Sequence, residues 1–157
     1  MTEKFDAVVV GAGPAGVTAA YVMAKNEMNV AIIERGEFPG SKNVIGGVLY
    51  VKTLNDIIPE FWKEAPLERR ITQHSYCLIA SEGHTFVTHR GAAHSGPPNG
   101  YTILRSKFDK RYAKKAQEAG ATLITKTNVT ELLSREGRIY GVRTDRGDVS
   151  ADLVVVA

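Results

Sequence analysis

The sequence predicts an α/β fold built on a parallel sheet with a dinucleotide-binding glycine turn. An apolar run at residues 7–10 ends in a glycine and fits a strand buried on both faces of such a sheet. Three glycines at G-x-G-x-x-G spacing follow it, and a second apolar run at residues 30–33 ends in Glu34. Strand, glycine turn, helix, strand and acid in this order predict a βαβ unit that binds the pyrophosphate of a dinucleotide.

Each residue of the glycine turn has a steric or electrostatic purpose. The first glycine allows a sharp turn off the strand, the second allows backbone to approach a phosphate, and the third lets the helix pack close to the sheet. Proline is tolerated in the first helical turn because its missing N–H has no intrahelical partner there. The helix N-terminus then favours an anion. The predicted contacts are Gly11, Gly13, Pro14, Ala15 and Gly16.

Glu34 is the expected ribose ligand. It ends the second strand near the spacing of about 20 residues that the dinucleotide motif requires. A carboxylate there accepts hydrogen bonds from ribose hydroxyls and repels a 2′-phosphate, which argues against NADP.

The composition is that of a soluble globular domain. Of the 157 residues, 43% are hydrophobic and 24% are charged, and the formal net charge is +3. The basic residues are scattered, so nothing favours a nucleic-acid partner. No apolar run approaches the ~18 residues that span a bilayer, and no signal-peptide pattern is expected. The single cysteine, Cys77, excludes an internal disulfide, is too few for an iron–sulfur cluster and fits a reducing cytoplasm.

The other elements are predicted from apolar periodicity and turn residues. In the first two thirds of the chain we expect a helix at 14–25, a loop at 37–50, a short helix at 51–62, a hairpin of strands 76–80 and 85–89, and a loop at 91–100. In the remainder we expect an extended segment at 101–105, a helix that starts at a Ser106–Asp109 capping box and ends at Gly120, and strands at 121–125, 129–135, 138–144 and 149–156.

Histidine and cysteine side chains suggest no metal site. The four histidines have no metal-ligand spacing and no acidic or cysteine partners at useful offsets, so we interpret them as ordinary strand and loop residues. Cys77 is interpreted as a small apolar strand residue. The histidines are His74, His84, His89 and His94.

Beyond these motifs, the chain resembles glutathione-reductase-type FAD-binding proteins and, in more detail, the FixC family. The closer resemblance is carried by residues 33–36, 39–50, 59–69, 102–105 and 108–109, and K-N-x-x-G-G-x-L-Y at 42–50 is its most specific part. FixC proteins are flavoproteins related to electron-transfer-flavoprotein:quinone oxidoreductases and, more distantly, to geranylgeranyl reductases. The resemblance implies a Rossmann-like parallel sheet with a β-meander crossover and an inserted antiparallel hairpin.

The resemblance also implies a cofactor and partners. A bound FAD would take electrons from an electron-transfer flavoprotein (a FixA/FixB-like pair) and pass them towards quinone. A ferredoxin-like, FixX-like subunit would supply iron–sulfur clusters, and the protein would be cytoplasmic with peripheral contact to the inner face of the cell membrane. The cofactor would be lined by Arg35, Lys42, Asn43, Gly46 and Gly47, with Arg105 at the FAD phosphate or ribityl region and Val129 near adenine. No residue is a candidate catalytic base.

The sequence departs from this pattern at its end. In this fold the last strand is followed by an Asp-containing motif that contacts the ribityl chain and pyrophosphate, and the sequence stops at Ala157, before it. We therefore expect a truncated fold that binds FAD weakly or not at all. It would comprise an incomplete FAD-binding domain at 1–70 and 101–157 and the start of an inserted substrate region at 71–100.

Three alternatives stay open. A geranylgeranyl-reductase-like flavoenzyme shares the fold and the dinucleotide motif, although the 42–50 segment favours FixC. A truncated, non-catalytic nucleotide-binding module is supported by the abrupt end. An NAD-dependent dehydrogenase fits Glu34 but not the long loop that follows it.

Overall fold

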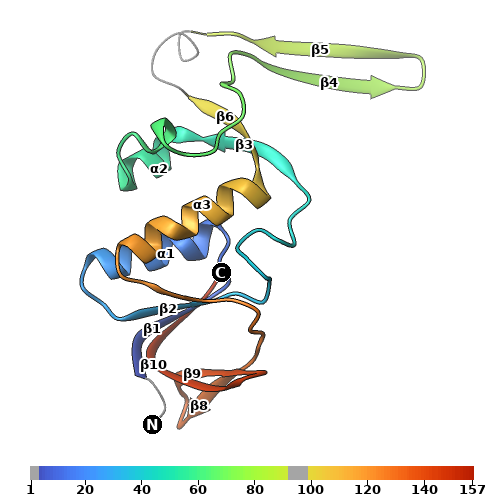
Figure 1. The fold of residues 1–157 in the computed structure, drawn as a ribbon. Coiled ribbons are helices and arrows are strands. Elements are labelled where there is room, and N and C mark those ends of the chain that lie inside the picture. The colour runs from blue at the N-terminus through green and yellow to red at the C-terminus, as the bar shows by residue number, and fades with distance from the viewer. Residues whose placement is uncertain (1–3, 92–98) are drawn as a thin grey trace. The chain divides into compact units, whose positions relative to one another are not determined.

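The computed structural model describes residues 4–91 and 99–157, and the chain separates into two compact units. The first unit is discontinuous and contains residues 1–45 and 105–157, and the second contains residues 46–104. The division expected from the sequence, at residues 70 and 100, lies inside the second unit. Figure 1 shows the course of the chain and the element labels.

The first unit is built on a six-stranded mixed sheet, as the sequence predicts for a Rossmann-like fold. The strand order is β7-β2-β1-β10-β9-β8. The first four of these strands run parallel, and β10, β9 and β8 form an antiparallel meander. The strands are β1 (Lys4–Val10), β2 (Val30–Ile33), β7 (Thr122–Ile124), β8 (Val129–Arg135), β9 (Arg138–Thr144) and β10 (Gly147–Val156).

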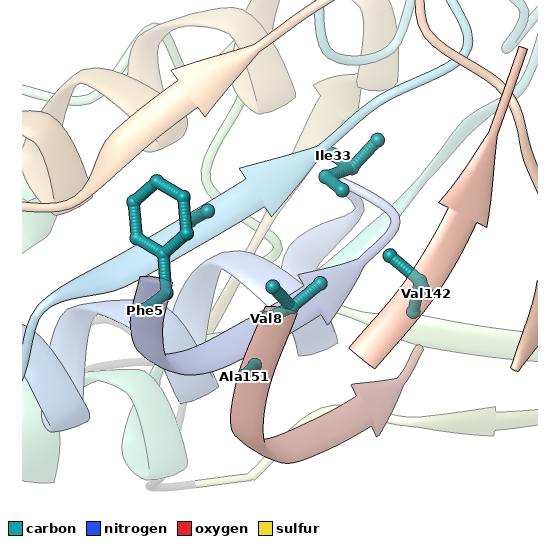
Figure 2. Close-up of a cluster of buried hydrophobic side chains, with 6 residues drawn as sticks. Phe5, Val8, Ile33, Val142 and Ala151 are labelled. Carbon is teal, nitrogen blue, oxygen red and sulfur yellow. The ribbon is translucent and has the colours of Figure 1, made fainter. Parts of the chain in front are cut away.

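Strand β1 is buried on both faces of the sheet. Alternate side chains of the strand point to opposite faces, and both faces are covered. Val9 lies towards helix α1 (Pro14–Lys25), where its Cγ1 approaches Gly16. Val8 belongs to a cluster drawn from β1, β2, β9 and β10, which Figure 2 shows in close-up. The cluster consists of Phe5, Val8, Ala31, Ile33, Val142 and Ala151, all at most 2% exposed.

Helices α1 and α3 (Arg105–Glu118) pack beside each other on the sheet (Figure 1). The Thr18 and Tyr112 hydroxyls join them at 2.8 Å. Helix α3 ends in a Schellman motif, as Gly120 predicts: its φ is +110°, its N–H binds the Gln117 carbonyl, and the Ala121 N–H binds the Ala116 carbonyl.

The predicted capping box at Ser106 is wrong. Helix α3 begins one residue earlier, at Arg105, so Ser106 lies inside the first turn. Asp109 does not reach back to cap the helix, because both of its carboxylate oxygens accept hydrogen bonds from Arg105.

The second unit contains two separate two-stranded sheets. β3 (Gly46–Tyr50) pairs antiparallel with β6 (Gly100–Leu104), which corrects the predicted loop at 37–50 over its last five residues. The predicted hairpin is confirmed as β4 (His74–Ala80) and β5 (Gly83–His89). The expected helix at 51–62 is shorter, consisting of α2 (Val51–Ile57) and a 3-10 turn, η1 (Phe61–Lys63). The expected 91–100 loop, with His94, falls largely outside the described residues.

The described residues contain neither a candidate membrane-spanning helix nor a candidate metal-binding cluster. None of their helices combines the length and apolar character needed to cross a membrane. Within residues 4–91 and 99–157, no group of three or more His, Cys, Asp or Glu side chains is arranged to hold a metal ion.

Candidate cofactor site

The first unit carries a cleft of about 330 Å³ where β1 and β2 end. This is the edge at which open α/β sheets bind their ligands, at the carboxyl ends of parallel strands. The two strands end in the cleft at Val10 and Ile33, and β8 begins there at Val129. The lining residues are Val10, Gly11, Gly13, Ile33, Glu34, Arg35, Gly40, Lys42, Asn43, Asp109, Thr127, Asn128, Val129 and Ala157.

The glycine turn fits the steric roles that the motif predicts. Gly11 has a φ of +102°, and a Cβ there would overlap the Ala157 carbonyl oxygen. A Cβ on Gly16 would overlap the Gly11 carbonyl oxygen and lie 3.1 Å from Val9 Cγ1, so α1 approaches β1 as closely as the backbone allows. A side chain at Gly16 would require the helix or the turn to move, and one at Gly11 would require the turn or the residue after β10 to move.

The first turn of α1 leaves backbone donors at the cleft. Gly13 is the N-cap residue and offers no side-chain acceptor, and Pro14 follows it. The first intrahelical bond runs from the Val17 N–H to the Gly13 carbonyl at 2.9 Å. The N–H groups of Ala15 and Gly16 therefore precede the helical hydrogen-bond ladder, and the helix dipole adds positive character at the same point. An anionic group is favoured there.

Glu34 links the glycine turn to the end of β2. Its Oε2 accepts a hydrogen bond from the Ala12 N–H at 3.0 Å, and its Oε1 accepts one from the Gly36 N–H at 2.6 Å. Carboxylate oxygens have lone pairs beyond these two bonds, so Glu34 can also accept hydrogen bonds from a diol in the cleft.

Thr127 and Asn128 also line the cleft, and they directly precede the predicted site residue Val129. The Glu34 N–H donates to the Ile124 carbonyl at 2.8 Å, and the Thr127 N–H donates to the Glu34 carbonyl at 3.1 Å. These bonds extend the β2–β7 pairing and carry Thr127 and Asn128 into the cleft. Neither residue belongs to a local motif, so only the three-dimensional pairing reveals them.

The partly exposed Arg105 and the fully buried Asp109 form an ion pair next to the glycine turn. The Arg105 Nε and Nη2 donate to the two Asp109 oxygens at 2.8 Å each. The hydrogen bond to Asp109 raises the pKa of Arg105 above its already high usual value. Arg105 does not line the cleft itself, but its Nη2 lies 3.8 Å from where a Cβ on Gly13 would be. Asp109 lines the cleft and was not predicted as a site residue.

The predicted site residues fall into three groups. Seven line the cleft: Gly11, Gly13, Glu34, Arg35, Lys42, Asn43 and Val129. Pro14, Ala15, Gly16 and Arg105 lie in the first turns of α1 and α3. Gly46 and Gly47 belong to the second unit, where they pair with Leu104 and Ile103 of β6.

The cleft chemistry matches the adenosine diphosphate half of a dinucleotide. Backbone donors at a helix N-terminus suit a pyrophosphate, a carboxylate at the end of β2 suits a ribose diol, and Val129 at the start of β8 lines the same cleft. The polar groups of the described cleft therefore suit the binding of a nucleotide through hydrogen bonds.

Comparison with known proteins agrees with this chemistry. Residues 6–157 match the model of a family described as FAD dependent oxidoreductase. Protein FixC of Bradyrhizobium diazoefficiens is 47% identical over 159 aligned residues, which cover 99% of this chain and 37% of that protein. The chain therefore spans a little over one third of the length of this relative.

Solved structures share the fold. A geranylgeranyl bacteriochlorophyll reductase-like protein of Thermoplasma acidophilum superposes with a TM-score of 0.83 at 27% identity, over 99% of this chain and 39% of that chain. The myxobacterial chondrochloren halogenase CndH, described as a variant of FAD-dependent halogenases, gives a TM-score of 0.79 at 25% identity, over 99% and 37%.

Proposed function

Because this chain belongs to the FAD dependent oxidoreductase family, we propose that its cleft holds the adenosine diphosphate half of FAD. The observation that carries the proposal is the placement of Glu34 and the glycine turn at one cleft, joined by the hydrogen bond from Ala12 to Glu34. The isoalloxazine of a bound FAD supplies the redox chemistry, and the protein binds and orients the cofactor.

The first test measures nucleotide binding to the 157-residue chain by calorimetry. We expect ADP and FAD to bind weakly and with similar affinity, because the described cleft offers contacts only to the half that they share. FMN lacks that half and serves as the control, so it should not bind. Binding of FMN in preference to ADP would contradict the placement, and absence of both ADP and FAD binding would refute it.

For the whole protein we propose electron transfer from an electron-transfer flavoprotein towards quinone. The support is the similarity to proteins named FixC over nearly the whole chain, including the Lys42–Tyr50 segment. A chimera tests this proposal: the chain replaces the matching segment of the B. diazoefficiens protein. We expect it to oxidise reduced electron-transfer flavoprotein with a quinone acceptor at a rate near that of the parent. A chimera that retains FAD but does not reduce quinone would contradict it.

The remaining partners and the location belong to the same proposal. A ferredoxin-like subunit would supply iron–sulfur clusters, and the protein would work on the cytoplasmic side of the cell membrane in peripheral contact with it. Co-purification of electron-transfer flavoprotein subunits and a ferredoxin-like protein with the tagged protein would support these assignments. Recovery of the tagged protein without any of them would count against the assembly.

A second candidate is reduction of isoprenoid double bonds, which the likeness to the geranylgeranyl bacteriochlorophyll reductase-like structure favours. The chimera also discriminates here, because it can be offered a geranylgeranyl substrate in place of quinone. Reduction of the isoprenoid without quinone reduction would favour this candidate.

A further inference from the structure

Asp109 is a carboxylate with no exposed surface, and it lines the cleft. A carboxylate buried this fully requires a cation and well-aligned donors, because desolvation of an unpaired charge is costly. Arg105 supplies both through two parallel hydrogen bonds of 2.8 Å. Such a bidentate ion pair, with two parallel hydrogen bonds, fixes the plane of the guanidinium as well as its position.

The fixed guanidinium lies beside the glycine turn. Its Nη2 is 3.8 Å from where a Cβ on Gly13 would be. Two of its five N–H groups bind Asp109, and among the described residues no protein acceptor binds the other three. These three donors are therefore available to an anion at the N-terminus of α1.

The loop that follows β2 lies against the first turn of α3, which carries this ion pair. Gly40 has a φ of +83°, and a Cβ there would come within 2.9 Å of Asp109 Cβ and 2.8 Å of the Arg105 carbonyl oxygen. The absence of a side chain at Gly40 thus lets the loop cover Asp109. Lys42 and Asn43, which also line the cleft, follow directly.

We propose that Asp109 is a positioning residue for the pyrophosphate of the cofactor: it holds Arg105 beside the glycine turn, so that the free guanidinium N–H groups meet the phosphates without first being ordered. The proposal rests on the proposed function of the cleft, and Asp109 is a positioning residue because it acts on the phosphates by holding Arg105 in place.

Removal of the Asp109 carboxylate has two opposite effects on anion binding. It restores the net charge of Arg105, which favours a phosphate, but it also frees a long side chain that must then be ordered when the ligand binds. The Arg105 side chain is 27% exposed, so salt at physiological ionic strength screens the gain in charge. Ordering a free arginine reduces affinity by about tenfold, and we expect this loss to prevail.

Calorimetry of ADP and of adenosine tests the proposal on the 157-residue chain. Asp109→Asn should weaken ADP binding about tenfold and leave adenosine binding within about twofold, because adenosine has no pyrophosphate. In an Arg105→Ala background the same substitution should not weaken ADP binding, because no guanidinium is left to position. Asp148→Asn, which breaks the exposed pair with Arg143, is the matched control and should change neither affinity.

The other outcomes are decisive in different ways. Equal weakening of ADP and adenosine binding would show a merely structural role, and tighter ADP binding would show that charge prevails; each would overturn the proposal. If the unmodified chain binds ADP and Asp109→Asn leaves the ADP affinity unchanged, the positioning role of Asp109 is refuted and the proposed function is not. If the unmodified chain does not bind ADP, the proposed function is refuted as well. Should Asp109→Asn fail to fold, Arg105→Lys keeps the charge without the bidentate ion pair, and an unchanged ADP-to-adenosine affinity ratio would overturn the proposal.

Discussion

Both carboxylate oxygens of Glu34 accept backbone hydrogen bonds, so Glu34 supports the glycine turn in addition to the ribose contact that we propose for it. In Glu34→Gln, one of the Ala12 and Gly36 N–H groups would face an amide NH₂ in place of an acceptor. A partly buried N–H without an acceptor costs about 1–3 kcal/mol. We expect urea denaturation to show a loss of that order and calorimetry to show weaker ADP binding. The unmodified chain should prefer ADP to its 2′-phosphorylated analogue, and the substitution should reduce that preference. Unchanged stability would contradict the bonding described for Glu34.

Gly16 is the second residue at which a small change should have a large effect. Its Cβ would overlap the Gly11 carbonyl oxygen, so Gly16→Ala must move α1 away from β1 or open the glycine turn. Overpacking of this kind costs about 1–3 kcal/mol, and we expect weaker ADP binding along with it. Gly83→Ala is the matched control, because nothing lies within 4 Å of where its Cβ would be. Equal stability changes in the two variants, by urea denaturation, would refute the close packing.

Single residues were predictable where their chemistry is local in the sequence. Gly11, Gly13 and Glu34 belong to one βαβ unit, and the structure brings all three to one cleft. Asp109 and Thr127 line the same cleft but come from segments far along the chain. Asp109 also resembles part of a capping box, and that interpretation hides its i, i+4 spacing from Arg105, which is the spacing of a helical ion pair. The backbone pairing that brings Thr127 beside Glu34 is absent from any motif.

At the scale of elements, α1 and α3 are joined by a hydrogen bond whose direction can be assigned. The Thr18 hydroxyl donates to the Pro14 carbonyl at 2.6 Å, so its hydrogen is committed and the Tyr112 hydroxyl is the donor between the helices. Burial raises the pKa of Tyr112 above its usual value of 10.0. The folded state therefore holds this proton at a pH at which the unfolded chain releases it, so the stabilisation is complete below about pH 10 and is lost as the pH rises through the folded pKa.

Tyr112→Phe tests this assignment. Near neutral pH it should reduce the free energy of unfolding by about 1 kcal/mol, the usual net contribution of one hydrogen bond. Above about pH 10 the difference from the unmodified chain should shrink, because only the unmodified chain still loses stability through this phenol. Urea denaturation from pH 7 to pH 11 measures both effects. Tyr140→Phe, at a position 44% exposed, is the control. A stability difference that stays constant with pH would count against the assignment.

Most elements were predictable because their sequences carry periodic apolar patterns or turn residues. Strand β3 lacks such an apolar pattern, and it was not predicted. Gly46 and Gly47 are poor strand residues and were expected in a loop. They form a strand because residues 46–50 pair with residues 100–104, a partner segment at least fifty residues away in the sequence. Long-range pairing overrides a weak local preference, and no local signal reports it.

At the scale of the whole chain, the discontinuous unit of residues 1–45 and 105–157 should fold without the segment between its two parts. The Arg105 N–H donates to the Ile45 carbonyl at 3.2 Å, so the two cut ends are neighbours. The next pair, Gly46 and Leu104, continues the antiparallel register. A two-residue Asn-Gly link is the natural closure for such a pair.

We therefore predict that replacement of residues 46–104 by Asn-Gly leaves a cooperatively folding protein that binds ADP within about threefold of the parent, a change of less than 1 kcal/mol. The reason is that every described residue lining the cleft lies in the retained unit.

Removal of residues 71–100 alone, the region that the sequence suggested as an insertion, is the matched comparison. It removes β4 and β5 and one residue of β6, and it leaves most of the β3–β6 pair in place. If the shorter deletion binds ADP and the longer one does not, residues 46–70 belong with the nucleotide site, as the sequence-based division had it. Equal ADP affinity in both, measured by calorimetry alongside thermal unfolding, would assign the adenosine half of the site to the first unit alone.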